Sequence, residues 1–154
     1  MSCNLAENGI VLSYEDKFRP DEVIAQKEIA LIIDSFDGGY HPYFATEEDY
    51  KAIVDSFVRR GVIKNSEKNP DARVTREDAV TYLVRLFGFE KAAEIKGIYK
   101  TGFSDEAQIS ADKLGYVAIA KGLRLVSGNG GKFNPQNNVT RAELAVMLYN
   151  ALDK

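Results

Sequence analysis

The sequence predicts an all-α protein made of repeated helix-loop-helix units. One short segment recurs three times, apolar residues recur at helical spacing, and turns rich in Gly or Asn separate the periodic stretches. The apolar face of a single hairpin is too small to bury itself, so three units should pack together around one core. A length of 154 residues suits one compact domain of this kind.

The recurring segment centres on a proline that precedes a helix. Residues 133–145 (FNPQNNVTRAELA) recur as residues 68–80 (KNPDARVTREDAV) and, less closely, as residues 18–30 (FRPDEVIAQKEIA). The three prolines lie 50 and 65 residues apart, which is close to the spacing of repeats that each form one supersecondary element. We therefore expect a first unit over residues 1–40, a second over 41–97 and a third over 98–154.

The helices of these units follow from apolar periodicity and from turn residues. The first unit is expected to be truncated, because about eight residues precede its turn and they cannot supply a full first helix. The second unit should contain helices over residues 47–60 and from Thr75 to about Phe87, with Gly61 ending the first of them. In the third unit we expect helices over about 111–121 and over 140–152, separated by the Gly-rich turn 127–131. A short helix is expected around residues 90–96.

The helix start at Thr140 can be interpreted in two ways. Thr140 and Glu143 have the spacing of a capping box, in which each side chain satisfies a backbone N–H group at the helix start. Arg141 has no capping role, and beside free N–H groups and the positive end of the helix dipole its guanidinium could hold a carboxylate. From geometry alone, a solvated surface arginine is the alternative. Thr75, Arg76 and Asp78 nearly repeat the arrangement.

Composition argues against several classes of function. The net charge of −3 and the pI near 5.3 do not suit nucleic acid, and no apolar run approaches the 20 or so residues that membrane insertion needs. The single Cys3 and single His41 leave out an internal disulfide, a multi-cysteine zinc site and catalysis based on histidine. We therefore predict no cofactor, no metal and no enzymatic activity. The N-terminus does not have the pattern of a signal peptide, so we expect either a cytoplasmic protein or a fragment of a longer exported one.

The third unit carries a family resemblance. Phe103-Ser104-Asp105, an amphipathic helix ending at Gly122, residues 128–133 (GNGGKF) and residues 139–143 (VTRAE) follow one another in an order that resembles S-layer homology repeats over about 50 residues. The second unit resembles the family from Thr75 onward. The first keeps the Phe and Pro of the pattern but has Ala25-Gln26 in place of Thr-Arg. The resemblance implies a pseudo-threefold arrangement of helical units, with binding grooves between neighbours.

The resemblance also implies a function, namely non-covalent anchoring of an exported bacterial protein to the cell wall. The partner would be the secondary cell-wall polysaccharide of bacterial peptidoglycan, which often carries pyruvate ketals, and the location would be extracellular, at the wall or the S-layer. The ketal carboxylate is the anion that a helix-start arginine would hold. The expected polysaccharide-binding residues are Thr140, Arg141 and Glu143, then Thr75, Arg76 and Asp78, and in the turn Gly128, Asn129 and Gly130.

Two alternatives remain open at the level of sequence. Because Gln26 takes the place of an arginine and the chain contains no tryptophan to stack on a sugar, the chain could instead be a degenerate scaffold or protein-interaction spacer without affinity for polysaccharide. The incomplete first unit could be completed by residues upstream or by a second chain, and in the second case the protein would self-associate.

Overall fold

The computed structural model describes residues 19–38 and 45–152, and within these ranges it is helical, with no strand. This confirms the predicted all-α class. The described part contains six α-helices and two short 3-10 helices: α2 (Gln26–Phe36), α3 (Glu47–Arg59), η1 (Asn65–Glu67), α4 (Arg76–Leu86), α5 (Glu90–Ala93), η2 (Glu106–Gln108), α6 (Leu114–Gly122) and α7 (Arg141–Leu152). The expected truncation of the first unit falls mainly on residues outside the described ranges.

Most helix boundaries agree with the sequence prediction. α3, α4 and α7 begin and end within about one residue of the expected positions. α6 begins at Leu114, three residues later than expected, because residues 111–113 form a turn. α5 stops at Ala93, short of the predicted end at residue 96. No described helix has both the length and the apolar character needed to cross a membrane.

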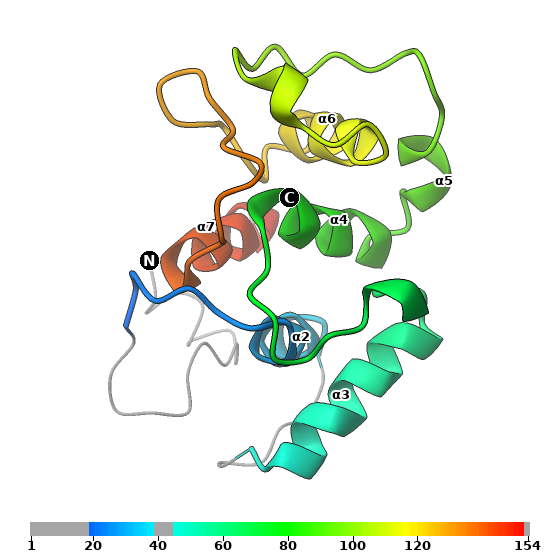
Figure 1. The fold of residues 1–154 in the computed structure, drawn as a ribbon, viewed down its shortest axis with the longest axis vertical. Helices are drawn as coiled ribbons and strands as arrows, with labels where there is room; N and C mark the ends of the chain where they lie inside the picture. Colours follow the sequence, from blue (N-terminus) through cyan, green and yellow to red (C-terminus); the bar gives the residue numbers. More distant parts are fainter. Residues whose placement is uncertain (1–18, 39–44, 153–154) are drawn as a thin grey trace.

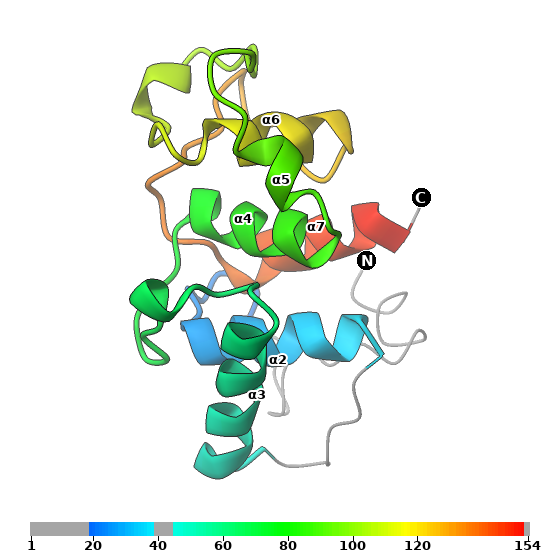
Figure 2. The ribbon, with the colours of Figure 1, turned by 90° about the vertical axis from the view of Figure 1, so that its right-hand side faces the viewer.

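In the second and third units, the first helix packs on the second helix of the preceding unit. α3, from the second unit, lies against α2 of the first, and α6, from the third unit, lies against α4 of the second. Figures 1 and 2 show these two pairs at opposite ends of the long axis, with α7 between them beside α2 and α4. Each hairpin therefore covers its neighbour's apolar face, and no unit forms a core by itself.

Short extended segments in front of α2, α4 and α7 join the three units in a ring. Ala25 of the first unit pairs with Arg73 of the second, Thr75 of the second pairs with Asn138 of the third, and Thr140 of the third pairs with Val23 of the first. Each of these bridges is antiparallel, and each joins equivalent positions of successive units. This cyclic pairing gives the molecule the pseudo-threefold arrangement that the family resemblance implies.

One continuous core lies between the units. Two positions before the first residue of α2, α4 and α7 stands an apolar residue that is almost fully buried in this core, namely Ile24, Val74 and Val139. The largest side chains with less than 2% exposure include Phe57 of α3, Leu83 of α4, Tyr116 of α6, Leu144 of α7 and Phe133 of the segment that precedes α7. α2 contributes Ile29, Ile32 and Ile33.

Candidate functional site

The helix starts at Thr140 and Thr75 are capped by side chains. The Thr140 N–H donates to Glu143 Oε1 at 3.0 Å and the Glu143 N–H donates to Thr140 Oγ1 at 3.2 Å, which confirms the predicted capping box. At α4 the Asp78 N–H donates to Thr75 Oγ1 at 3.3 Å. Burial raises the pKa of Asp78, although the Lys113 ammonium opposes the shift. These four residues therefore have a structural role at the helix starts.

The first N–H groups of these helices donate hydrogen bonds to carbonyl groups of a neighbouring unit. At α7, the Arg141 N–H donates to the Glu22 carbonyl at 2.9 Å and the Ala142 N–H to the Pro20 carbonyl at 3.0 Å. At α4, the corresponding acceptors are the carbonyls of Asn137 and Pro135, at 2.9 and 3.2 Å. The expectation that these groups are open to an anion is wrong, because the ring of units satisfies them within the chain.

Arg141 faces the first unit and is buried. Only 3% of its side chain is exposed, and its Nη2 lies 3.0 Å from Glu28 Oε2 and 3.5 Å from Glu22 Oε1. The expectation of a solvent-facing guanidinium is therefore wrong for this residue. Arg141 instead ties the third unit to the first through charge-assisted hydrogen bonds.

Arg76 makes the equivalent contact from the second unit to the third. Its Nε donates to the Phe133 carbonyl at 2.8 Å, its Nη1 pairs closely with Glu143, and its guanidinium lies 5.1 Å from the centre of the Phe133 ring. Gln26 holds the third equivalent position. It donates to the Glu67 carbonyl at 2.9 Å and accepts from the Asn69 N–H at 2.8 Å. The second residue of each helix thus links successive units.

Part of the predicted site gathers around one cavity of about 220 Å³, which we call the loop cleft. Its lining includes Arg76 and Glu143 from the starts of α4 and α7, and Gly128 and Asn129 from the Gly-rich turn. The other predicted residues, Thr75, Asp78, Gly130, Thr140 and Arg141, do not line this cavity. The structure therefore brings together four of the nine predicted residues, and whether they bind polysaccharide stays a prediction.

A larger cavity of about 410 Å³, the central cleft, lies between the second and third units and contains none of the predicted residues. The loop at η1, the side of α4, the stretch after α5 and the start of α6 enclose it. It is lined by Lys64, Ser66, Glu67, Arg85, Glu94, Lys96, Asp112, Lys113 and Tyr116. Four of these residues are cations and three are carboxylates, so the lining carries a small net positive charge although the chain as a whole is acidic.

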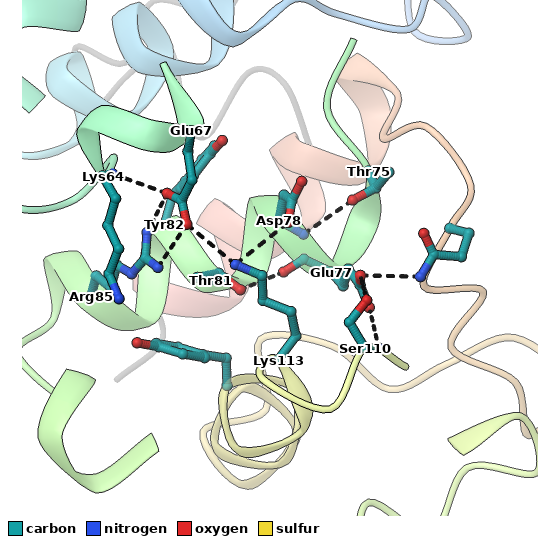
Figure 3. A network of polar contacts seen from close by, with 12 residues as sticks. Lys64, Glu67, Thr75, Glu77, Asp78, Thr81, Tyr82, Arg85, Ser110 and Lys113 are labelled. Carbon is teal, nitrogen blue, oxygen red and sulfur yellow. Dashed lines mark hydrogen bonds and ion pairs between the residues drawn. The ribbon is translucent and has the colours of Figure 1, made fainter. Parts of the chain in front are cut away.

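The charges in the central cleft are held in a network (Figure 3). Arg85 donates from Nη1 to Glu67 Oε2 at 2.7 Å and from Nη2 to Glu67 Oε1 at 3.0 Å, while Lys113 Nζ lies 3.4 Å from Glu67 Oε1. Burial alone would raise the pKa of Glu67, but the hydrogen bonds from Arg85 and the Lys64 N–H lower it to about 2. The carboxylate is therefore ionised at any physiological pH.

One cation of the central cleft has no such partner. Lys96 is exposed, and within the ranges that the structure describes it forms no ion pair. Lys64, by contrast, pairs with Glu94 at 3.1 Å. An anionic ligand entering the cleft would meet Lys96 first as an available charge.

Sequence reasoning missed the central cleft because its residues come from four separate segments. One signal was present. Arg85 is a charged residue on a helix whose neighbours Tyr82, Leu83 and Val84 are apolar and buried, and a cation in such a position needs a partner or a ligand. Arg85 stands ten residues after Thr75, and the equivalent residue ten after Thr140 is Asn150, which lines the loop cleft. The two cavities thus share an equivalent position on the second helices of successive units.

Comparison with known protein families gives a match to part of the chain. The family model of the S-layer homology domain matches residues 102–145, which include η2, α6, the Gly-rich turn and the start of α7. The match therefore covers the interval in which the sequence resemblance is strongest. It includes residues that line both cavities, among them Lys113 in the central cleft and Asn129 in the loop cleft.

Relatives match a longer stretch. The chain is 28% identical over 97% of its length to an amylopullulanase of Thermoanaerobacterium thermosulfurigenes and 26% identical over 97% to the exoglucanase XynX of Acetivibrio thermocellus. It is 36% identical over 57% of its length to a surface layer protein of Brevibacillus choshinensis. The chain spans only 9%, 15% and 8% of these relatives, so it corresponds to a small part of much larger proteins.

Proposed function

Since residues 102–145 belong to the S-layer homology domain family, we propose that the chain attaches a larger protein to a bacterial cell wall by binding an acidic secondary cell-wall polysaccharide. The family and the relatives named as surface layer, cell wall and cell surface proteins support cell-wall anchoring in general and an extracellular location at the wall or the S-layer. The pyruvylated ligand and the residues that hold it are the finer parts of the proposal.

The observation that carries the proposal is the cationic central cleft between two units of the ring. Four cations and three carboxylates line a cavity of about 410 Å³, which is within the size range of ligand sites in proteins. Lys96 is the cation among them that forms no ion pair within the described residues. Ketal carboxylates on a polysaccharide would supply the matching negative charge. Arg85 at the floor of the cleft offers the fork that suits a carboxylate.

The module itself is proposed to have no catalytic role. The amylopullulanase and the exoglucanase align with this chain over only 9% and 15% of their own lengths, so their printed activities apply to much longer proteins. Attachment of such enzymes to the surface of the cell is the role that we propose for the corresponding segment.

Co-sedimentation with wall sacculi tests the anchoring function. The chain is expected to sediment with untreated sacculi and to stay in solution when the secondary polymer has been chemically removed. Binding that persists after removal would contradict the proposed partner. High salt should weaken binding, because Lys96 is exposed and its contact with a carboxylate would be screened.

Two lysine variants locate the binding site. Lys96→Ala and Lys113→Ala should each lower the affinity for sacculi several-fold, because each removes a cation that lines the central cleft. Lys91→Ala is the matched control, since Lys91 is an exposed lysine on α5 that does not line the cleft. Equal binding by all three variants would place the site elsewhere, with the loop cleft as the next candidate.

A second candidate function is a scaffold without affinity for polysaccharide. The observation in its favour is that Arg76 and Arg141, the two helix-start arginines, are both engaged in contacts between units. A chain that fails to bind sacculi from several Gram-positive bacteria yet unfolds cooperatively would support this function over anchoring.

A further inference from the structure

Glu67 occupies the place in the central cleft that best suits a carboxylate. Its two oxygens accept from both terminal nitrogens of Arg85, at 2.7 and 3.0 Å, and Oε2 also accepts from the Lys64 N–H at 2.9 Å. Lys113 Nζ adds a third cationic contact at 3.4 Å. Figure 3 shows Arg85 and Lys113 directed at this one carboxylate from different elements.

The donors in this arrangement are more deeply buried than the acceptor. The side chains of Arg85 and Lys113 are 3% and 12% exposed, whereas that of Glu67 is 24% exposed. Arg85 Nε is buried and has no hydrogen-bond partner within the described part of the chain, and it lies 4.0 Å from Glu90 Oε1. Glu67 is therefore the most exposed member of the group, and a ligand that enters from solvent would meet its carboxylate before the Arg85 fork.

Glu67 and Arg85 both lack a counterpart in the equivalent cleft of the next unit. Aligned from the apolar pairs Val62-Ile63 and Leu125-Val126, Glu67 corresponds to Gly130. Aligned from Thr75 and Thr140, which start the second helices, Arg85 corresponds to Asn150. The loop cleft therefore has no counterpart of this pair; its own arginine and carboxylate, Arg76 and Glu143, come from the starts of α4 and α7 and pair with each other. The central cleft differs in that two cations from separate elements, Arg85 and Lys113, converge on one carboxylate.

We propose that Glu67 is an internal competitor for the ligand, so that an acidic sugar must displace it from Arg85 and Lys113 to bind in the central cleft. This inference rests on the proposed function and concerns the same site. The intramolecular carboxylate lowers the affinity for acidic saccharides and makes a neutral saccharide a poor ligand, because a neutral group cannot replace the charge that Arg85 would lose. Since Glu67 remains ionised down to about pH 2, the competition does not vary over physiological pH.

The variant Glu67→Gln tests the proposal, with a methyl hexoside that carries a pyruvate ketal as the probe. The amide keeps the shape of the side chain but removes the competing charge, so the affinity for the ketal should rise about tenfold, measured by isothermal titration calorimetry. The same hexoside without the ketal should show no gain. Glu94→Gln is the matched control, because Glu94 also lines the cleft but pairs with Lys64 and not with the Arg85 fork. It should change the affinity by a smaller factor.

A spectroscopic measurement keeps the test valid if Glu67→Gln destabilises the fold. In the unaltered chain, nuclear magnetic resonance signals of the Glu67 carboxyl carbon and the Arg85 guanidinium should shift together as the ketal binds. Binding without those shifts would overturn the proposal, as would a folded Glu67→Gln variant with unchanged or lower affinity. If Lys96→Ala still weakens attachment to sacculi in that case, the anchoring function stands and the competitor role fails. If neither the chain nor the variant binds ketal or sacculi, both are refuted.

Discussion

Replacement of Arg141 by alanine tests the structural role of the helix-start arginine. The variant removes the contacts of Nη2 with Glu28 and Glu22 at the junction of the first and third units, and Glu22 keeps its ion pair with Arg19 at 2.7 Å. Breaking a buried ion pair typically costs about 3–5 kcal/mol. Both glutamates keep a quarter to a third of their side chains exposed and can be rehydrated, so we expect a loss of about 2–3 kcal/mol in the free energy of unfolding.

Urea denaturation followed by far-UV circular dichroism measures this loss. With a slope of about 2 kcal/mol per molar of urea, the midpoint should fall by about 1 M while the slope stays unchanged. Arg59→Ala is the control, because Arg59 is an exposed arginine at the end of α3, and its midpoint should shift by less than about 0.3 M. If Arg141→Ala shifts the midpoint no more than Arg59→Ala does, the contacts of Arg141 do not stabilise the junction between the first and third units, and its structural role is refuted.

Two further predictions concern the turn and the central cleft. Gly128→Ala should destabilise the chain by about 2–4 kcal/mol in thermal unfolding, because Gly128 has φ +80 and an added Cβ would lie 2.6 Å from the Phe103 ring. Gly130→Ala is the control, since Gly130 has φ +60 but open space around it, and it should cost about 1 kcal/mol. Equal losses in the two variants would contradict the close packing of Gly128 on Phe103. The nuclear magnetic resonance signal of the Glu67 carboxyl group should titrate near pH 2. The ion pair of Glu67 therefore contributes fully to the free energy of unfolding above the unfolded pKa near 4.5, and this contribution is lost as the pH falls toward 2. A titration midpoint above pH 4 would refute the ion pair with Arg85.

The sequence predicts the helices well because their signals are local. Apolar spacing and the terminating glycine define α3, and the Thr140–Glu143 spacing defines the cap of α7, all within a few turns of one helix. The three similar segments around Pro20, Pro70 and Pro135 also predict the number of units. These features do not depend on how the units are placed relative to one another.

The surroundings of the helix-start arginines could not be predicted in the same way. Which carbonyl accepts from the Arg141 N–H depends on the antiparallel bridge between Thr140 and Val23, residues more than a hundred positions apart. Sequence periodicity carries no information on that pairing. Knowledge of the ring would have shown that the N–H groups at the start of α4 and α7 are already satisfied.

The central cleft escaped prediction for a related reason. Lys64, Arg85 and Lys113 lie in the loop after α3, on α4 and just before α6, and only the packing of α6 on α4 brings them together. The family resemblance directed attention to the Thr-Arg-x-Glu segment instead. Arg85, a charged residue among the buried residues of α4, was the local signal of the central cleft.

Isothermal titration of the chain with purified secondary polymer, before and after mild acid hydrolysis removes its ketal carboxylates, tests the central claim most directly. If the cationic central cleft binds the acidic groups of the polymer, the intact polymer should bind, and the hydrolysed polymer should lose most of that affinity while its neutral backbone remains. Equal affinity for the two forms would contradict recognition of the carboxylate by Lys96, Lys113 and Arg85.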